Sequence, residues 1–258
     1  MTSVVGILQA RTSASRLPGK VLLPILGEPM LFRHIERLRR SAEMNVVVVA
    51  TSTDPIDDVL AAACRERDVP CCRGSLDDVL GRVVQAARPY QPDVVVRLTG
   101  DCPLADPALI DEVIRHFRAG AYDYVSNCFP PTFPDGLDVE VMRFSRLEEA
   151  DREAVLPSHR EHVTPFLRAF PGRFRIGHVA APIDLSALRW TVDEPADFEF
   201  VRLVYEHLYP AKPDFATQDI LDLVERESAM QAINARFTRN EGTRKSLQAD
   251  AEYLARKR

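Results

Sequence analysis

The sequence predicts an α/β protein built on a doubly wound, mostly parallel sheet. Four strand-like and four helix-like segments alternate within the first 120 residues, which is the pattern of successive strand–helix units around a parallel sheet. Residues 45–51 (NVVVVAT) form an unbroken β-branched run, as expected for a strand covered on both faces. Right-handed crossovers follow by default for such units.

The elements can be placed in order along the chain. Strands are expected over residues 4–8, 45–51, 69–72 and 92–98, and helices over 30–40, 56–67, 76–87 and 106–119. The first helix has its apolar residues at 31, 32, 35 and 38, the spacing of an amphipathic helix. The fourth begins with Asp106 and Pro107, residue types favoured at the N-cap and first helical positions.

The second half of the chain breaks this alternation. Residues 128–185 contain several prolines and short alternating stretches such as 137–142, so we interpret them as a small β/loop region inserted on the sheet of one domain, 1–258. Helices resume at 195–208 and 217–227. The charged C-terminal segment, 238–258, is expected to form a helix packed on the body or on a partner.

Composition excludes several classes of protein. Of 258 residues, 46% are hydrophobic, which excludes an intrinsically disordered chain. Lys and Arg number 33 against 38 Asp and Glu, a net charge of −5 that excludes a generally basic nucleic-acid binder. No apolar window is long enough to span a membrane, and no signal peptide is expected before the first strand. Five cysteines without a C-x-x-C pair argue against a disulfide framework and favour the cytoplasm.

A basic loop follows the first strand. Residues 8–20 (LQARTSASRLPGK) place Arg11, Arg16 and Lys20 among small hydroxyl residues, at the strand end where open α/β sheets bind ligands. Arginine offers forked donors to phosphate oxygens and lysine a point charge. The loop matches neither a Walker loop nor G-x-G-x-x-G. It is therefore a candidate phosphate site, the alternative being a solvated basic loop.

Two carboxylates follow later strands. Asp101 lies in residues 97–104 (RLTGDCPL) at the end of a buried strand, where it could hold Mg²⁺ against phosphates or merely cap a turn. Asp193 lies in residues 190–197 (WTVDEPAD), where a short strand is expected to deliver it just before a proline-started helix. It is either a second ligand or an N-cap.

Two further segments are candidates for substrate contacts. Asp138 and Glu140 alternate in residues 134–141 (PDGLDVEV), so they should share one sheet face and could accept hydrogen bonds from sugar hydroxyls. The alternative is a solvent-facing strand. Residues 158–165 (SHREHVTP) offer His159 and Arg160 to an acidic substrate. Zinc held by His159 and His162 is conceivable but lacks a third ligand nearby, and a plain surface is the remaining alternative.

In combination these segments resemble the sugar-activating cytidylyltransferases, which include the CMP-KDO and CMP-acylneuraminate synthetases. The likeness rests on the loop 9–20, the Gly-Asp101-Cys-Pro-Leu turn and the Val-Asp193-Glu-Pro turn. It is greatest to the spore-coat-polysaccharide type, through residues 135–140 (DGLDVE), 160–165 (REHVTP) and 239–247 (RNEGTRKSL). It covers nearly the whole chain. One departure is that Ser13 and Ala14 stand where the family usually has Gly-Ser.

The resemblance implies a Rossmann-like, glycosyltransferase-A-like nucleotidyltransferase fold, CTP as donor, Mg²⁺ as cofactor and a homodimer formed through the inserted region. It implies Arg11, Lys20 and Asp101 as catalytic residues and Asp101 with Asp193 as metal ligands. Arg97, Asp138, Glu140, His159 and Arg160 are expected to contact the acceptor. The nucleotide-binding residues would be Leu8, Ala10, Arg11, Arg16, Lys20, Thr51, Arg73, Asp78, Arg82 and Asp101.

The expected function is transfer of CMP from CTP to an acidic sugar or a phosphorylated or phosphonate acceptor, with release of pyrophosphate. Such a reaction needs positioning and charge neutralisation rather than a side-chain nucleophile. A nucleotide-diphosphosugar glycosyltransferase is one alternative, although the Asp101 turn lacks the usual Asp-x-Asp metal motif. A non-catalytic nucleotide-binding homologue is another. No nucleic-acid or membrane partner is expected, and the acceptor itself stays open.

Overall fold

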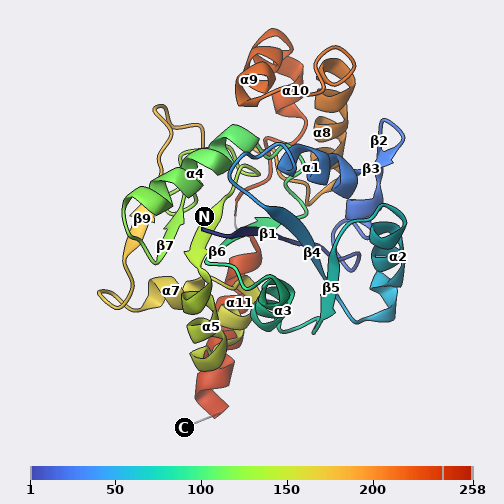
Figure 1. Ribbon diagram of the computed structural model, residues 1–258. Helices are drawn as coiled ribbons and strands as arrows, with labels where there is room; N and C mark the ends of the chain where they lie inside the picture. Colours follow the sequence, from blue (N-terminus) through green and yellow to red (C-terminus); the bar gives the residue numbers. More distant parts are fainter. Residues whose placement is uncertain (1, 240, 257–258) are drawn as a thin grey trace.

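Seven strands form one sheet in the computed structural model (Figure 1). The structure describes residues 2–239 and 241–256, without the side chains of residues 241–245 and 247. All strands run in one direction except β8, which is antiparallel to both of its neighbours. The predicted doubly wound, mostly parallel sheet is therefore confirmed. In spatial order the strands are β5 (Cys71–Gly74), β4 (Val46–Ser52), β1 (Val4–Gln9), β6 (Val94–Thr99), β8 (Glu140–Arg143), β7 (Tyr124–Ser126) and β9 (Ile176–His178).

Helices cover both faces of the sheet. One face carries α1 (Met30–Leu38), α2 (Asp58–Glu66), α4 (Pro107–Ala119), α8 (Pro195–Leu208) and α9 (Thr217–Arg226), with α10 (Ser228–Ala232) beside α9. The other face carries α3 (Val79–Ala87), α5 (Phe144–Glu153) and α7 (Pro165–Ala169), with α6 (Pro157–His162) and α11 (Glu241–Arg256) packed on each other. A two-stranded hairpin, β2 (Pro24–Ile25) and β3 (Glu28–Pro29), precedes α1.

The side chains of β1 contribute to the hydrophobic cores on both faces of the sheet. Val4 and Leu8 belong to the core on the α1 side, whereas Val5 and Ile7 belong to the core on the α3 side. Successive side chains of a strand point to opposite faces. Because both faces are buried, every position of a central strand can be apolar, which explains the uninterrupted β-branched run of β4.

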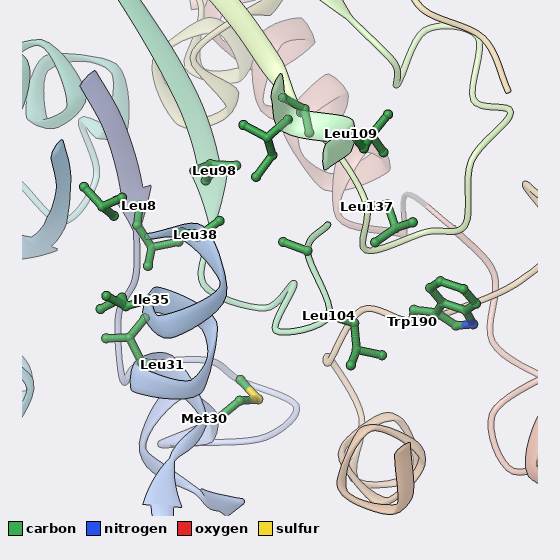
Figure 2. Packing of buried hydrophobic residues seen from close by; sticks show 14 of the residues in the cluster. Leu8, Met30, Leu31, Ile35, Leu38, Leu98, Leu104, Leu109, Leu137 and Trp190 are labelled. Atoms are coloured by element: carbon green, nitrogen blue, oxygen red, sulfur yellow. The ribbon is translucent and has the colours of Figure 1, made fainter. Parts of the chain in front are cut away.

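The larger core fixes the loops that carry polar residues. Figure 2 shows Leu31, Ile35 and Leu38 of α1 packed near Leu8 of β1, as the helical spacing in the sequence predicts. Leu104 and Trp190 belong to the same cluster, and each lies in a loop a few residues from a candidate carboxylate, Asp101 or Asp193. Burial of these anchors holds both loops against the body.

The inserted region differs from the expectation of short strands and loops. Between residues 128 and 185 the chain adds β8 and β9 to the main sheet and forms the helices α5, α6 and α7. The strand expected over 137–142 begins only at Glu140, where pairing with β6 and β7 starts. The segment is thus continuous with the sheet and more helical than its proline content suggested.

The strand expected before Asp193 is replaced by a short bridge. Residues 135 and 189 pair in isolation, and the Trp190 amide donates to the Asp135 carbonyl at 2.6 Å. Gly136, with φ of 112°, lies so close that a Cβ there would be 2.5 Å from the Thr191 amide nitrogen. Only glycine permits this approach, which brings two distant segments of the chain together.

Candidate active site

The strands deliver their following loops to one edge of the sheet. β1 and β6 are neighbours, yet the chain leaves β1 towards β4 on one side and returns to β6 on the other. This reversal is the position at which open α/β sheets bind ligands. Two adjoining cavities lie there, the first of about 300 Å³ and the second of about 450 Å³. They share Gln9, Arg16, Thr99, Asp101, His162 and Asp193 as lining residues.

The loop after β1 forms the wall of the first cavity. The Thr12 amide and hydroxyl both donate to Asp57 Oδ1 at 2.7 Å, and the Gly19 amide donates to the Thr12 carbonyl at 2.8 Å. Asp57 also accepts from the Ser52 hydroxyl at the end of β4. Burial would raise the pKa of Asp57, but these donors lower it. A buried carboxylate therefore fixes the loop to the neighbouring strand.

The cations predicted to bind phosphate line this cavity. Arg11, Arg16 and Lys20 do so together with Arg82 of α3. Arg11 is exposed and makes no ion pair or hydrogen bond with any residue that the structure describes. Arg16 pairs with Asp193 at 3.0 Å and Glu194 at 3.3 Å. The first cavity is thus a basic pocket in which Arg11 keeps its charge available for a ligand.

Lys20 brings the two predicted metal ligands together. Its Nζ is 2.8 Å from Asp193 Oδ1 and 3.4 Å from Asp101 Oδ2, and it donates to the Val192 carbonyl at 2.6 Å. Burial would lower the pKa of Lys20, but the two carboxylates raise it. Burial would likewise raise the pKa of Asp101, but Lys20 and hydrogen bonds lower it to about 2. Lys20 and Asp101 are therefore both charged near neutral pH.

Asp193 is held by a buried network at the start of α8. Its amide and that of Glu194 both donate to Asp197 Oδ2 at 2.9 Å. Arg189 binds both oxygens of Asp197 at 2.8 Å, and the Asn234 side-chain amide donates to Asp197 at 3.0 Å. Burial would raise the pKa of Asp197, but Arg189 and the amides lower it. Asp197 is therefore an ionised cap that orients the chain at Asp193.

Glu140 lines the second cavity, but its oxygens are already occupied. It accepts from the Tyr124 hydroxyl at 2.5 Å, from Thr164 Oγ1 at 2.6 Å and from the Arg97 guanidinium. Burial would raise the pKa of Glu140, but Arg97 and these hydroxyls lower it. The Arg97 charge is neutralised in the same contact. Glu140 and Arg97 therefore shape the cavity wall rather than offer free groups to a ligand.

Two further carboxylates line the second cavity. Asp138 binds the Arg239 guanidinium, and Asp135 pairs with Arg189 at 3.1 Å and Arg239 at 3.5 Å. Burial raises the pKa of Asp135 to about 6 although the arginines oppose it. Asp138 and Glu140 thus line one cavity as expected, although Asp138 precedes the strand rather than lying on it.

Known proteins resemble the chain over most of its length. A family model described as cytidylyltransferase matches residues 5–209. The chain belongs to the cytidylyltransferase family. It is 34% identical over 235 residues to the spore coat polysaccharide biosynthesis protein SpsF of Bacillus subtilis, covering 88% of this chain and 95% of that protein. A 3-deoxy-manno-octulosonate cytidylyltransferase of Anaeromyxobacter dehalogenans is 38% identical over 123 residues, 46% of this chain and 49% of that enzyme.

Solved structures agree with this assignment. A cytidylyltransferase structure from Leptospira borgpetersenii matches with a TM-score of 0.85 and 31% identity, over 92% of this chain and 99% of that one. A CMP-2-keto-3-deoxy-manno-octonic acid synthetase complexed with CTP matches with a TM-score of 0.61 at 21% identity, over 80% of this chain and 100% of that one. The second likeness concerns the fold alone.

Several predicted nucleotide contacts of this cytidylyltransferase lie outside both cavities. Leu8 is a core residue and Thr51 is fully buried. Arg73 of β5 donates to the Ser52 and Asp54 carbonyls, which turns its guanidinium along the sheet edge instead of into a cavity. Asp78 caps α3 by accepting from the Gly81 amide at 3.0 Å. Of the predicted nucleotide residues, the first cavity is lined by Ala10, Arg11, Arg16, Lys20, Arg82 and Asp101.

The expected acceptor contacts on α6 are also displaced. His159 is buried and packs its ring edge-to-face on Phe166, with ring centres 5.9 Å apart. Arg160 binds Asp78 and Asp151, so its charge joins α6 to α3 and α5. Neither residue lines a cavity that the structure describes at this edge. In this structure α6 turns these two side chains towards its helical neighbours, and their contact with the acceptor stays a prediction.

Other residues of this cytidylyltransferase take their place in the second cavity. His162, the last residue of α6, lines both cavities, and Arg168 of α7 lines the second. Arg168 places its guanidinium 3.7 Å from the Phe129 ring centre, and its Nε has no hydrogen-bond partner among the described residues. The motif containing His162 was visible in the sequence, but only the end of α6 determines which of its side chains face the cavities.

The structure contributes two further observations on ligands and membranes. No cluster of three or more His, Cys, Asp or Glu side chains suited to a metal ion occurs among the described residues, so zinc on His159 and His162 gains no support. Within the same part of the chain, no helix is both long and apolar enough to cross a membrane.

Proposed function

We propose that this cytidylyltransferase transfers CMP from CTP to an acidic sugar or related acceptor, releasing pyrophosphate, in the synthesis of surface-polysaccharide or glycan precursors. One observation carries the proposal: a basic cavity and a mixed-charge cavity meet at Asp101 and Asp193. Such an arrangement suits a triphosphate on one side and a polar acceptor on the other. The names of its relatives support the same reaction class.

The residues of the first cavity would neutralise and orient the triphosphate. Arg11 is available for a forked contact with phosphate oxygens, and Arg82 adds positive charge from α3. Lys20 is committed to Asp101 and Asp193, so its part would be to hold those carboxylates and to balance charge as phosphates enter. Attack on the α-phosphorus by an acceptor oxygen then needs alignment more than covalent chemistry.

The donor set around Lys20 fits a magnesium ion. The side-chain oxygens of Asp101 and Asp193 converge on the single ammonium group of Lys20, and magnesium in nucleotide sites is usually held by one or two carboxylates together with phosphates. Asp101 and Asp193 would hold the ion. When bound, it would supply charge stabilisation to the phosphate oxygens.

Two wider properties belong to the same proposal. We expect a homodimer formed through residues 128–185, the segment that carries the edge strand β9. We also expect a cytoplasmic enzyme, since the five cysteines form no disulfide. Sedimentation of the purified chain at micromolar concentration measures the first property, and a predominantly monomeric species would contradict it.

The reaction is tested by a pyrophosphate-release screen. Each of the four ribonucleoside triphosphates is incubated with magnesium and a panel of acceptors: 3-deoxy-manno-octulosonate, N-acetylneuraminate, a sugar 1-phosphate and 2-aminoethylphosphonate. We expect release with CTP only, dependent on one acceptor and abolished by EDTA. Release from UTP or ATP at comparable rates, or from CTP without any acceptor, would contradict the proposal.

A further inference from the structure

His162 occupies the boundary between the two cavities. It is the last residue of α6, and it is one of six residues that line both. The others are the strand-end residues Gln9 and Thr99, Arg16 and the two carboxylates Asp101 and Asp193. Of these six, His162 alone has a side chain that is an ordinary proton acceptor near neutral pH without being a predicted metal ligand.

Hydrogen bonds determine which nitrogen of His162 carries the proton. The Ser246 hydroxyl of α11 donates to Glu161 Oε2 at 2.7 Å, and a carboxylate can only accept. The single hydroxyl hydrogen of Ser246 is thereby used. Ser246 Oγ is also 2.8 Å from His162 Nε2, so Nε2 must donate and carries the ring proton. The unprotonated nitrogen is then Nδ1, which has no hydrogen-bond partner among the described residues.

The helix that supplies Ser246 is anchored beside α6. Asp250, one turn further along α11, accepts from the Ser158 amide at 2.8 Å and from the Ser158 hydroxyl at 2.5 Å. Both residues are buried. This second contact fixes α11 relative to α6. Ser246 is therefore held beside Glu161 and His162.

We propose that His162 is the general base of the reaction and that Ser246 and Glu161 position it. The proposal rests on the proposed function. His162 Nδ1 takes the proton of an acceptor hydroxyl while that oxygen forms a bond to the α-phosphorus of CTP. The bond from the α-phosphorus to the bridging oxygen breaks, and its electron pair leaves with pyrophosphate. The imidazolium returns its proton to solvent.

This assignment narrows the acceptor class. A phosphate or phosphonate oxygen is already ionised at neutral pH and has no proton to lose, whereas a sugar hydroxyl must be deprotonated as it attacks. A base at the cavity boundary therefore favours a hydroxyl nucleophile. The surroundings suit the role: burial lowers the pKa of His162, Arg97 and Arg168 lower it further, and Glu161 and Glu140 oppose them.

Kinetics with defined acceptors provide the first test. His162→Gln should lower kcat about 10²- to 10³-fold with CTP and a hydroxyl acceptor, 3-deoxy-manno-octulosonate or N-acetylneuraminate, while the CTP dissociation constant from calorimetry stays within about twofold. The acid limb of the kcat–pH profile should disappear. Ser246→Ala should cost about tenfold, and Ser246→Thr, which keeps a hydroxyl, should recover most of it. His207→Gln, at an exposed position of α8, is the matched control.

A second readout does not require turnover. Nitrogen-15 NMR of the free protein should show His162 protonated at Nε2 and unprotonated at Nδ1 at pH 7.5, and Ser246→Ala should weaken that tautomer preference. A His162 protonated at Nδ1, or a His162→Gln variant within threefold of the wild-type rate, would overturn the proposal. So would efficient turnover of 2-aminoethylphosphonate with none of the hydroxyl acceptors. Lack of any CTP turnover contradicts the proposed function instead, and the tautomer still decides the position of the proton.

Discussion

Most charged residues at the cavity boundary are paired with one another. The paired residues hold each other in place, whereas a residue without an ion pair is available to a ligand. Lys20 and Arg16 contact Asp193, and Arg97 contacts Glu140. Arg11, by contrast, lines the first cavity with no ion pair to another described residue. Substitutions at neighbouring positions of the site are therefore expected to have different effects.

Asp101→Asn removes one carboxylate while preserving side-chain size. Because the pKa of Asp101 is lowered to about 2, the wild-type group is ionised throughout the working range. Loss of a charged ligand worth several kcal/mol should reduce pyrophosphate release at least about 100-fold. The circular dichroism spectrum should not change. Asp184→Asn, at an exposed site, is the control; near-normal turnover in Asp101→Asn would leave Asp101 as a turn residue only.

Arg11→Ala should act on CTP rather than on the acceptor. Arg11 lines the first cavity, so we expect the KM for CTP to rise about tenfold or more, as for loss of a charge-assisted contact. Arg11→Lys should recover only part of this, since a point charge does not reproduce a forked contact. Equal increases in both KM values would instead indicate a general disturbance of the site.

At the scale of elements, the loop after β1 depends on a residue that its own sequence does not contain. Asp57, in the turn Pro55–Asp57 after β4, accepts three hydrogen bonds from Thr12 and Ser52. The loop therefore keeps its shape through the neighbouring strand. Sequence patterning could find the basic loop but not this support, because a buried aspartate after a strand resembles an ordinary helix cap.

Asp57→Ala should loosen the loop. Removing the acceptor leaves the Thr12 amide buried without its partner, so stability should fall by about 2 kcal/mol. The KM for CTP should rise as well, because the loop carries Arg11 and Arg16. Urea unfolding and steady-state kinetics measure the two effects. Asp58→Ala, the exposed neighbour paired with Arg73, is the control, and equal behaviour of the two variants would remove Asp57 from the account.

Element prediction succeeded where one signal dominated. The spacing of Leu31, Phe32, Ile35 and Leu38 predicted α1, and Asp106 with Pro107 predicted the start of α4. It failed at residues 190–192, where a short strand was expected before Asp193. There the chain makes a single bridge to Asp135 beside Gly136, and such pairing depends on a partner more than 50 positions away.

At the scale of the whole molecule, Glu140 ties several strands to one helix. It accepts from Arg97 of β6, Tyr124 of β7 and Thr164 before α7. Its pKa is lowered from the ordinary 4.5. A carboxyl with a lowered folded-state pKa contributes stability that is present above pH 4.5 and is lost as the pH falls through the folded-state value.

Glu140→Gln should therefore change both the level and the pH dependence of stability. At pH 7 it leaves the Arg97 charge buried without its partner, which should cost about 3 kcal/mol. Below pH 4.5 the difference from wild type should shrink. Guanidinium unfolding at a series of pH values measures this. A difference that stays constant from pH 7 to pH 3 would show that Glu140 is not ionised in the folded protein.

Convergence of the site at one sheet edge was predictable, because parallel strands end on the same side. Arg11, Lys20 and Asp101 were found in this way, and they line the first cavity. The contributions of Arg239 and Ser246 were not, since no periodicity tells where a C-terminal helix will dock. His159 and Arg160 lie outside both cavities, which the sequence could not show, because a six-residue helix has no sequence signal for the face that it turns to a cavity.

The central claim is that CMP, and not a sugar or a terminal phosphate, is the group transferred. It is tested most directly with CTP labelled separately at the α- and γ-phosphorus, incubated with magnesium and 3-deoxy-manno-octulosonate or N-acetylneuraminate. We expect the α label to enter the acceptor product and the γ label to appear as pyrophosphate, in equal amounts. Appearance of the γ label as inorganic phosphate or on the acceptor, or release of pyrophosphate without transfer of the α label to an acceptor, would contradict it.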